Sequence, residues 1–289
     1  MNVPGSIKQQ VQQFYDQVGW QQVAEGVYQN MRYEDLRPVS AEYRRRCHLR
    51  VGRHLAPRGR FLLDAGSGPV QYPEYLTYSQ GYTYRVCADI SLVALKEART
   101  RLGEHGLYVV ADVANLPFRA EAFEGAVSLH TFHHLPLEEQ VKAYRELYRV
   151  LKPGASGVVV NGWTDSPLMR RFEWVMRLAE RLKTRLQRSS PSPVAQPSSA
   201  QEGATPAGTY VEKMTPEWLK AHIGIQMPLE IRVWRSVSVR FLRAVIHERL
   251  LGRFWLRLLY ALEERFPHYF GEKGQYPLII LRKSNKESA

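Results

Sequence analysis

Residues 61–70 of this chain read FLLDAGSGPV, and they decide its fold. An apolar run of strand length ends on the carboxylate of Asp64 and is followed at once by a turn that contains Gly66 and Gly68. Glycine has no Cβ, so the backbone can turn tightly there and a ligand can lie directly against it. Open α/β sheets bind ligands at the carboxyl ends of their strands, so this stretch predicts a ligand-binding edge of a parallel sheet.

Three further strand candidates follow, and each ends on a polar residue that would lie at the same edge. They are Tyr84–Ala88 before Asp89, Leu107–Ala111 before Asp112, and Phe123–Leu129 before His130. Asp89 comes about 25 residues after Asp64, near the spacing at which nucleotide-binding folds place the acid that holds ribose hydroxyls. Chance explains one such residue, but four at one edge predict a binding crevice.

These residues resemble the class I S-adenosylmethionine-dependent methyltransferases, specifically the subgroup of ubiquinone-biosynthesis and small-molecule enzymes. The resemblance covers roughly residues 14–160 and returns at the last strand, 276–282. It rests on six motifs in the family's order and spacing: LDAGSG at 63–68, ADIS at 88–91, ADV at 111–113, LPF at 116–118, FHHL at 132–135 and RVLKPG at 149–154. One departure is Val70, which stands where the family has a third glycine, so the start of the following helix is left open.

The resemblance implies an enzyme that binds S-adenosyl-L-methionine. The implied cofactor-binding residues are Asp64, Ala65, Gly66, Ser67, Gly68, Asp89, Ile90, Asp112 and Val113. The glycine turn would lie against the amino-acid end of the cofactor, with Asp64 near its ammonium group. Asp89 would accept hydrogen bonds from both ribose hydroxyls, and Ile90 would pack on the adenine. Asp112 would accept from the adenine amino group, while the Val113 N–H would donate to a ring nitrogen.

Strands alternate with helices along the core, which predicts a parallel sheet with right-handed connections. We expect an α/β fold: a Rossmann-like, doubly wound sheet of about seven mostly parallel strands, with the last strand antiparallel. Ser91 is expected to cap a helix through about Leu102; a further helix is expected over 137–151 and the fifth strand over 158–161. The expected organisation is an N-terminal helical cap over 1–56 and a methyltransferase domain over 57–289.

The N-terminal cap begins with Ile7, Val11, Phe14 and Val18 at helical spacing. Ser40 is expected to be the N-cap of a helix that runs through about Leu55. Aromatic residues of the cap and of the glycine turn are expected to line the mouth of the crevice: Tyr15, Trp20, Tyr28, Tyr33 and Tyr72.

An insertion over 163–228 interrupts the domain. Residues 167–188 read as a basic amphipathic helix, while 189–208 consist of Ser, Pro, Ala and Gln with almost no bulky apolar residue and are predicted to be a disordered linker. Thr215 is expected to cap a short helix with proline at its first position. Residues 230–241 alternate in polarity, which predicts a strand with one wet face.

Residues 250–262 form a late helix with a wide apolar face and a stripe of Arg249, Arg253 and Arg257. The favoured interpretation is that the apolar face covers the sheet and lines the acceptor mouth. The alternative is a basic amphipathic helix that lies in the headgroup plane of an anionic membrane.

The composition fits one large globular domain with an insertion. The chain has 289 residues, of which 44% are hydrophobic and 24% charged, and its two cysteines are too few for a disulfide framework. Residues 1–10 lack the apolar core of a signal peptide, so a cytoplasmic protein is expected, with peripheral contact with the inner face of the membrane as the alternative. The formal net charge of +12 is compatible with nucleic acid, anionic lipid or an acidic substrate as partner.

Methyl transfer from a sulfonium needs mainly alignment and desolvation, and a base only where the nucleophile must lose a proton. His130 is the candidate catalytic residue, as base or substrate ligand, whereas His133 and His134 match a family pattern and favour a structural role. No metal site is predicted, because the histidines lack the spacing and partners that a metal requires.

Two other chemistries are disfavoured. A nicotinamide oxidoreductase would carry a third spaced glycine where Gln71 stands, and methyltransferases of base amines carry an acidic or amide residue with two prolines where 128–131 read SLHT. The predicted function is methyl transfer to an oxygen or carbon of a small, lipophilic acceptor. The alternatives are an RNA methyltransferase, a methyltransferase of membrane-associated lipids or glycans, or a catalytically silent cofactor-binding accessory protein.

Overall fold

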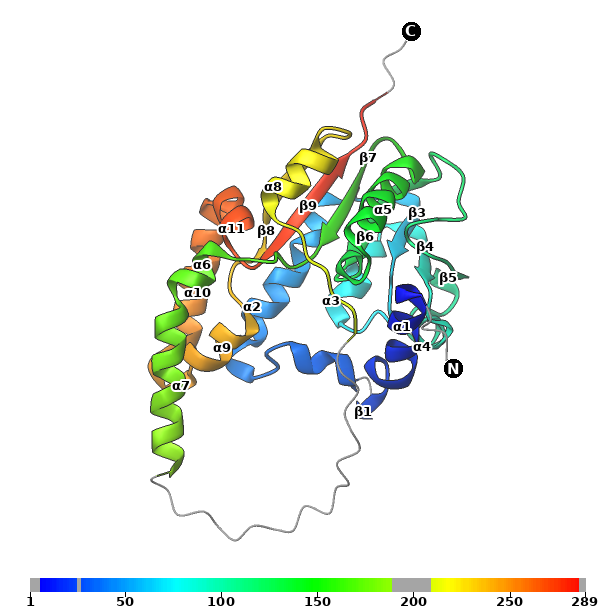
Figure 1. Ribbon diagram of the computed structural model, residues 1–289. Helices are drawn as coiled ribbons and strands as arrows, with labels where there is room; N and C mark the ends of the chain where they lie inside the picture. The colour runs from blue at the N-terminus through cyan, green and yellow to red at the C-terminus, as the bar shows by residue number, and fades with distance from the viewer. Residues whose placement is uncertain (1–5, 25–26, 189–208, 286–289) are drawn as a thin grey trace.

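A seven-stranded sheet forms the centre of the computed structural model, which describes residues 6–24, 27–188 and 209–285 (Figure 1). The strand order is β5-β4-β3-β6-β7-β9-β8, and β9 alone runs antiparallel to its neighbours. The strands are β3 (Gly59–Ala65), β4 (Tyr82–Asp89), β5 (Gly106–Val110), β6 (Phe123–Leu129), β7 (Leu151–Val160), β8 (Leu229–Arg235) and β9 (Tyr276–Arg282). The predicted Rossmann-like sheet with an antiparallel last strand is therefore confirmed.

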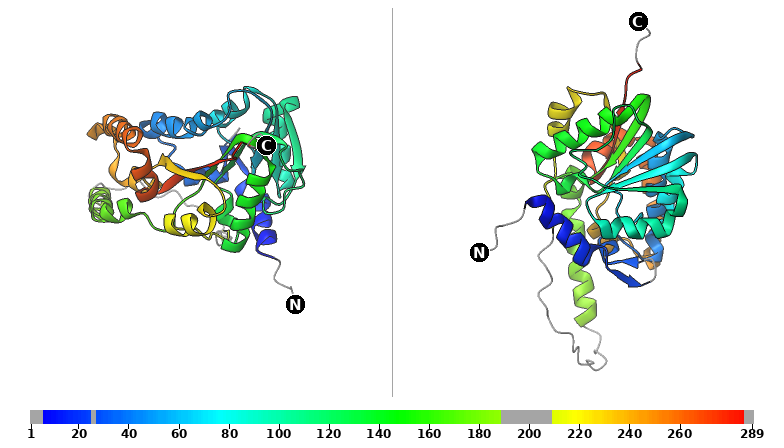
Figure 2. Two further views of the ribbon diagram at one scale, coloured as in Figure 1. Left: turned by 90° about the horizontal axis from the view of Figure 1, so that it is seen from above. Right: turned by 90° about the vertical axis from the view of Figure 1, so that its right-hand side faces the viewer.

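Helices cover both faces of the sheet, as the view from above shows (Figure 2). Successive side chains of a strand point to opposite faces, so Leu63 packs with α5 (Leu137–Val150) in one core cluster and Leu62 with α2 (Pro38–Leu49) in the other. Because both faces are buried, the strands read as the near-continuous apolar runs seen in the sequence. The order reverses at β3, which places a crevice at the carboxyl ends of β3 and β6.

The turn after β3 explains the departure at Val70. Val70 has a φ of 52°, the left-handed conformation that glycine adopts easily, and its side chain is fully buried. The helix that follows, α3 (Pro73–Leu76), is a single turn that begins at a proline. The sequence thus keeps the glycine-like backbone without the glycine.

Capping decides where several helices begin. The predicted Ser91 cap is confirmed, because its Oγ accepts the Ala94 N–H at the start of α4 (Leu92–Leu102). The predicted Ser40 cap is wrong: α2 begins earlier, at Pro38, which needs no N–H partner at the first helical position. Ser40 lies inside this helix, and its hydroxyl donates to Asp35 at 2.6 Å.

The segment predicted as a strand over 230–241 is only partly extended. β8 ends at Arg235, and Ser238 then caps α9 (Val239–Val245) through the Phe241 N–H. The strand prediction is therefore wrong over 236–241, because Ser238 caps a helix that begins within the alternating pattern.

The insertion contains helices on both sides of the predicted linker. The basic helix is divided into α6 (Pro167–Arg171) and α7 (Glu173–Arg188). Thr215 caps α8 (Pro216–Leu219) as predicted, whereas the linker over 189–208 lies outside the described residues.

The late helix α10 (Gly252–Arg265) precedes α11 (Pro267–Lys273), and α10 packs on α2 through Leu256 and Tyr260. The apolar face expected to cover the sheet instead points outward, with Trp255 52% and Leu258 43% exposed. That expectation is wrong because α10 is apolar on two sides and only one of them is buried. Within the described residues, every helix is too short or too polar to span a bilayer.

The remaining elements are short. They are α1 (Ile7–Phe14), the hairpin of β1 (Gln22–Ala24) and β2 (Val27–Tyr28), and single turns over Tyr15–Gly19, Gln29–Tyr33, Val51–His54, Thr77–Ser79, Gly103–His105, Phe132–His134, Lys220–Gly224 and Glu248–Leu250.

Candidate functional site

A cavity of about 460 Å³ lies over the carboxyl ends of β3, β4, β5 and β6. It brings together nearly all predicted site residues: Asp64, Gly66, Ser67, Gly68, Asp89, Ile90, Asp112, Val113 and His130. Ala65 does not line it, because this residue is fully buried in β3.

The glycine turn is shaped as a cradle. Gly66 and Gly68 have φ values of 74° and 53°, which residues with a Cβ rarely adopt. A Cβ on Gly66 would collide with the side chain of Thr131, and one on Gly68 would stand 3.0 Å from the Trp20 ring. Because the Thr131 hydroxyl also donates to the Gly66 carbonyl at 3.0 Å, the cradle is fixed from the β6 side.

Asp89 holds the cradle against β4. Its Oδ2 accepts the Gly68 N–H and its Oδ1 accepts the Ser91 N–H, both at 2.9 Å. Burial raises the pKa of Asp89 to about 6, although these two hydrogen bonds act in the opposite direction. A buried carboxylate at the end of β4 can accept the hydrogen bonds that ribose hydroxyls donate.

Two of the predicted carboxylates have partners that the sequence did not indicate. Asp64 is 3% exposed and receives two hydrogen bonds from Arg85, at 3.0 and 2.5 Å, both of which end on Oδ2. Asp112 forms an ion pair with Lys8 of α1 at 2.5 Å. A cofactor at this site must therefore use the remaining lone pairs of these carboxylates or displace Lys8.

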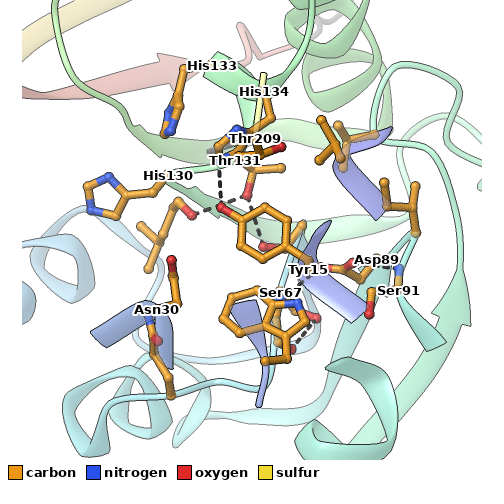
Figure 3. A pocket seen from close by; sticks show the side chains of 18 of the residues that line it. Tyr15, Asn30, Ser67, Asp89, Ser91, His130, Thr131, His133, His134 and Thr209 are labelled. Carbon is orange, nitrogen blue, oxygen red and sulfur yellow. Dashed lines mark hydrogen bonds between the residues drawn. The ribbon is translucent and has the colours of Figure 1, made fainter. Parts of the chain in front are cut away.

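Side chains of the N-terminal segment line the crevice, and Tyr15 is one of them (Figure 3). The Tyr15 ring stacks on Trp20 with 4.8 Å between centroids, and its hydroxyl forms a 2.8 Å hydrogen bond with Nε2 of His134. The Gln12 side chain donates to the carbonyl of Ile90 at 2.8 Å. Figure 3 shows Tyr15 in the middle of the cavity, between Asp89 on one side and His130 on the other.

His130 follows β6 directly and has an unusual backbone with a φ of 56°. Its half-buried ring packs edge-on against Trp234 and Tyr276, with centroids 5.0 and 6.0 Å apart. Burial lowers the pKa of His130 to about 3, so the imidazole is neutral near pH 7. His134, in contrast, is held by the Tyr210 carbonyl and by Tyr15.

A buried ion pair lies beside His130. Arg235 is 1% exposed and donates to Glu34 at 2.5 Å, and its guanidinium also lies over the Tyr276 ring. Burial opposes ionisation of Glu34, but the charge of Arg235 prevails and lowers its pKa. Sequence reasoning missed both residues, which lie 201 positions apart and follow no motif.

The half of the cavity near His130 is otherwise largely aromatic. Tyr33, Tyr72 and Tyr276 line it, as expected for the first two. Lys213 also lines it, and its ammonium forms no ion pair with any described residue. Burial lowers the pKa of Lys213. This half can accept an apolar body with a small polar or anionic group.

Residues 63–159 match the methyltransferase domain family, and they contain the glycine turn, Asp89, Asp112 and His130. The predicted resemblance is thereby confirmed, and S-adenosylmethionine is the cofactor of such domains. The cradle and the Asp89 carboxylate fit this cofactor.

Relatives differ in their acceptors. A tRNA (carboxymethyluridine(34)-5-O)-methyltransferase of Arabidopsis thaliana is 37% identical over 121 residues, 40% of this chain and 28% of that protein. A sterol methyltransferase-like protein of Botryococcus braunii is 34% identical over 102 residues, 34% of this chain and 25% of that protein. The matched parts thus span only about a quarter of these relatives.

A solved structure extends the likeness of the fold to nearly the whole chain. Geranyl diphosphate C-methyltransferase of Streptomyces coelicolor A3(2) has a TM-score of 0.54 and 15% sequence identity, covering 98% of this chain and all of that one. At this identity the likeness concerns the fold alone.

Proposed function

We propose that this chain, which carries a class I S-adenosylmethionine-dependent methyltransferase domain, methylates an oxygen or carbon atom of a small, lipophilic acceptor. The observation that carries the proposal is the continuity of the cavity. The same cavity reaches from Asp89, which suits a cofactor ribose, to the aromatic surroundings of His130.

The residues of the cofactor half have distinct tasks in this proposal. Asp89 accepts from the ribose hydroxyls, and the cradle of Gly66 and Gly68 lies against the amino-acid end of the cofactor. When bound, S-adenosylmethionine supplies a methyl group on a sulfonium. Tyr15 and Trp20 exclude water from above, which favours displacement at a carbon that carries positive charge in the ground state.

The residues of the acceptor half bind and orient. A neutral imidazole at His130 donates or accepts a hydrogen bond to a polar atom of the acceptor, whereas a pKa of about 3 makes it a weak general base. We expect His130→Ala to lower turnover while S-adenosylmethionine affinity changes less than about twofold. His130→Asn, which keeps a hydrogen-bonding group, is expected to recover part of the turnover.

RNA is the second candidate acceptor. Five relatives are named as tRNA methyltransferases or probable tRNA methyltransferases, and a net charge of +12 would favour phosphate contacts. An accessory protein that binds the cofactor without turnover is the third candidate. It is disfavoured because the glycine turn and the acidic residues Asp64, Asp89 and Asp112 are all present.

Radiolabelled S-adenosylmethionine separates these candidates. The purified protein is incubated with the organic-extractable and RNA fractions of cells, and label transfer is measured, with Asp89→Asn as the negative control. We expect label in the organic-extractable fraction. Label confined to RNA would replace the small acceptor by RNA, and cofactor binding with no transfer to either fraction would favour the accessory protein.

A further inference from the structure

Large apolar side chains are concentrated on the surface of two segments. Of the 21 large apolar side chains that are exposed among the described residues, twelve lie in 172–182 and 250–269. We call them the apolar patch: Phe172, Trp174, Leu178, Leu182, Leu250, Leu251, Phe254, Trp255, Leu258, Leu262, Phe266 and Tyr269. Single exposed apolar residues are ordinary, but two groups of this size at one end of the molecule are typical of an interaction surface.

The outer face of α10 cannot turn inward to bury its share of the patch. The opposite face is held in the core by Leu256 and Tyr260, which are 2% and 7% exposed. The Tyr43 hydroxyl of α2 donates to the buried Glu263 at 2.7 Å, and the same carboxylate receives Arg50 at 2.9 Å. Rotation of α10 would break this buried network, so its outer face needs an apolar partner of its own.

The contribution of α7 is also fixed in orientation. Trp174, Leu178 and Leu182 follow one another at steps of four, so they form a single stripe. Arg240 of α9 pairs with both glutamates of α7 at 2.9 Å and holds the other side of the helix. Figures 1 and 2 place α7 and α10 at the same end of the molecule, with α9 between them.

The charge around the patch is positive. Residues 167–188 contain seven basic and only two acidic residues, and both acidic residues pair with Arg240. The exposed Arg171, Arg181, Arg249 and Arg257 form no ion pair with any described residue. Apolar stripes with tryptophan, bordered by unpaired arginines, complement the headgroup region of an anionic bilayer.

A groove at this end of the molecule lies beside the site. It has a volume of about 600 Å³ and is lined by α7, α9 and the turn at Gln29–Tyr33. Tyr33 and Tyr276 line both this groove and the main cavity. An acceptor held in the headgroup region could therefore reach the aromatic half of the cavity along a surface of the protein.

We propose that α7 and α10 dock this protein onto an anionic phospholipid surface, and that its acceptor is a membrane-resident lipid which enters through the groove beside Tyr33. The acceptor part of this inference rests on the proposed methyltransferase function, whereas the docking part can be tested without turnover.

Vesicle flotation tests the docking. The full chain is mixed with phosphatidylcholine vesicles with or without phosphatidylglycerol, and the same sample is titrated with S-adenosylmethionine by calorimetry. We expect flotation only with the anionic vesicles and its decrease at high salt. Two double variants remove apolar side chains of the patch: Trp255→Ser with Leu258→Ser, and Trp174→Ser with Leu178→Ser. Each should lower the partition coefficient onto anionic vesicles at least about tenfold, without a change in cofactor affinity.

Ile225→Ser is the matched control, because this apolar residue is 79% exposed but lies outside the patch. Cofactor binding without flotation would overturn the docking and leave the proposed function intact. Flotation without cofactor binding would overturn the proposed function and the acceptor part of the inference, and would leave the docking intact. Three other results would refute the inference. The first is an equal loss of flotation in the Ile225 variant, and the second is self-association that the patch variants abolish. The third is RNA binding, in place of flotation, that Arg249→Gln and Arg257→Gln abolish.

Discussion

Replacement of Asp89 by asparagine is the sharpest perturbation of the cofactor site, since it preserves volume and removes one acceptor. Both carboxylate oxygens accept backbone N–H groups at 2.9 Å, from Gly68 and Ser91. The new amide nitrogen must therefore face one of these donors, and an unsatisfied buried N–H costs about 1–3 kcal/mol. The charged acceptor for the ribose is lost as well. We expect the Kd for S-adenosylmethionine to rise about ten- to a hundredfold.

Isothermal titration calorimetry measures this change, with urea unfolding in parallel to verify that the variant is folded. Asp165→Asn is the control, because this carboxylate is 48% exposed and lies outside the cavity; its effect should stay within about twofold. An Asp89→Asn protein that is folded and binds the cofactor as tightly as the natural chain would refute the role of Asp89.

Three further outcomes are expected. Arg85→Met should lower the free energy of unfolding in urea by about 3–5 kcal/mol, because it leaves the buried Asp64 carboxylate without its ion-pair partner. Adding Asp64→Asn should recover part of the lost stability. A loss under about 1 kcal/mol in the Arg85 variant would contradict this expectation. Gly66→Ala should weaken cofactor binding at least about tenfold. Gly103→Ala should not, because Gly103 also has a positive φ, of 54°, but nothing lies within 4 Å of a Cβ built there. Cofactor affinity should fall as the pH drops through about 6, where Asp89 takes up a proton; a flat profile from pH 5 to about 7 would contradict this.

The pKa of Asp89 also has a consequence for stability. Its folded pKa of about 6 lies above the usual value of about 3.9, so the folded state binds the proton more tightly than the unfolded state. The contribution of this group to stability is therefore present at low pH and is lost as the pH rises from about 4 to about 6.

Much of the fold was predictable because its signals are local. The run Phe123–Leu129 coincides with β6, and the other strands begin or end within a few residues of the predicted limits. Strands buried on both faces are largely apolar, so their sequence alone reveals them. Ser91 is equally readable, because a cap acts within three residues.

The errors arise where distant contacts decide. The periodicity of α10 cannot say which of its two apolar sides is buried; that is settled by Tyr43, which contacts Glu263 from 220 residues away. Ser40 has the chemistry of a cap, but the proline two positions before it begins the helix.

The site shows the same division. The glycine turn and Asp89 follow from a motif, whereas the partners of the other carboxylates do not. Lys8 meets Asp112 across 104 residues, and Glu34 meets Arg235 across 201. Ion pairs of this kind depend on tertiary structure, and no local sequence pattern predicts them.

Calorimetric titration of the full chain with S-adenosylmethionine, and separately with NADH, tests the central claim most directly. Saturable binding of S-adenosylmethionine at one site per chain, weakened by Asp89→Asn, with no binding of NADH, is the predicted result. A folded sample that binds NADH, or that binds S-adenosylmethionine equally well without the Asp89 carboxylate, would contradict the account.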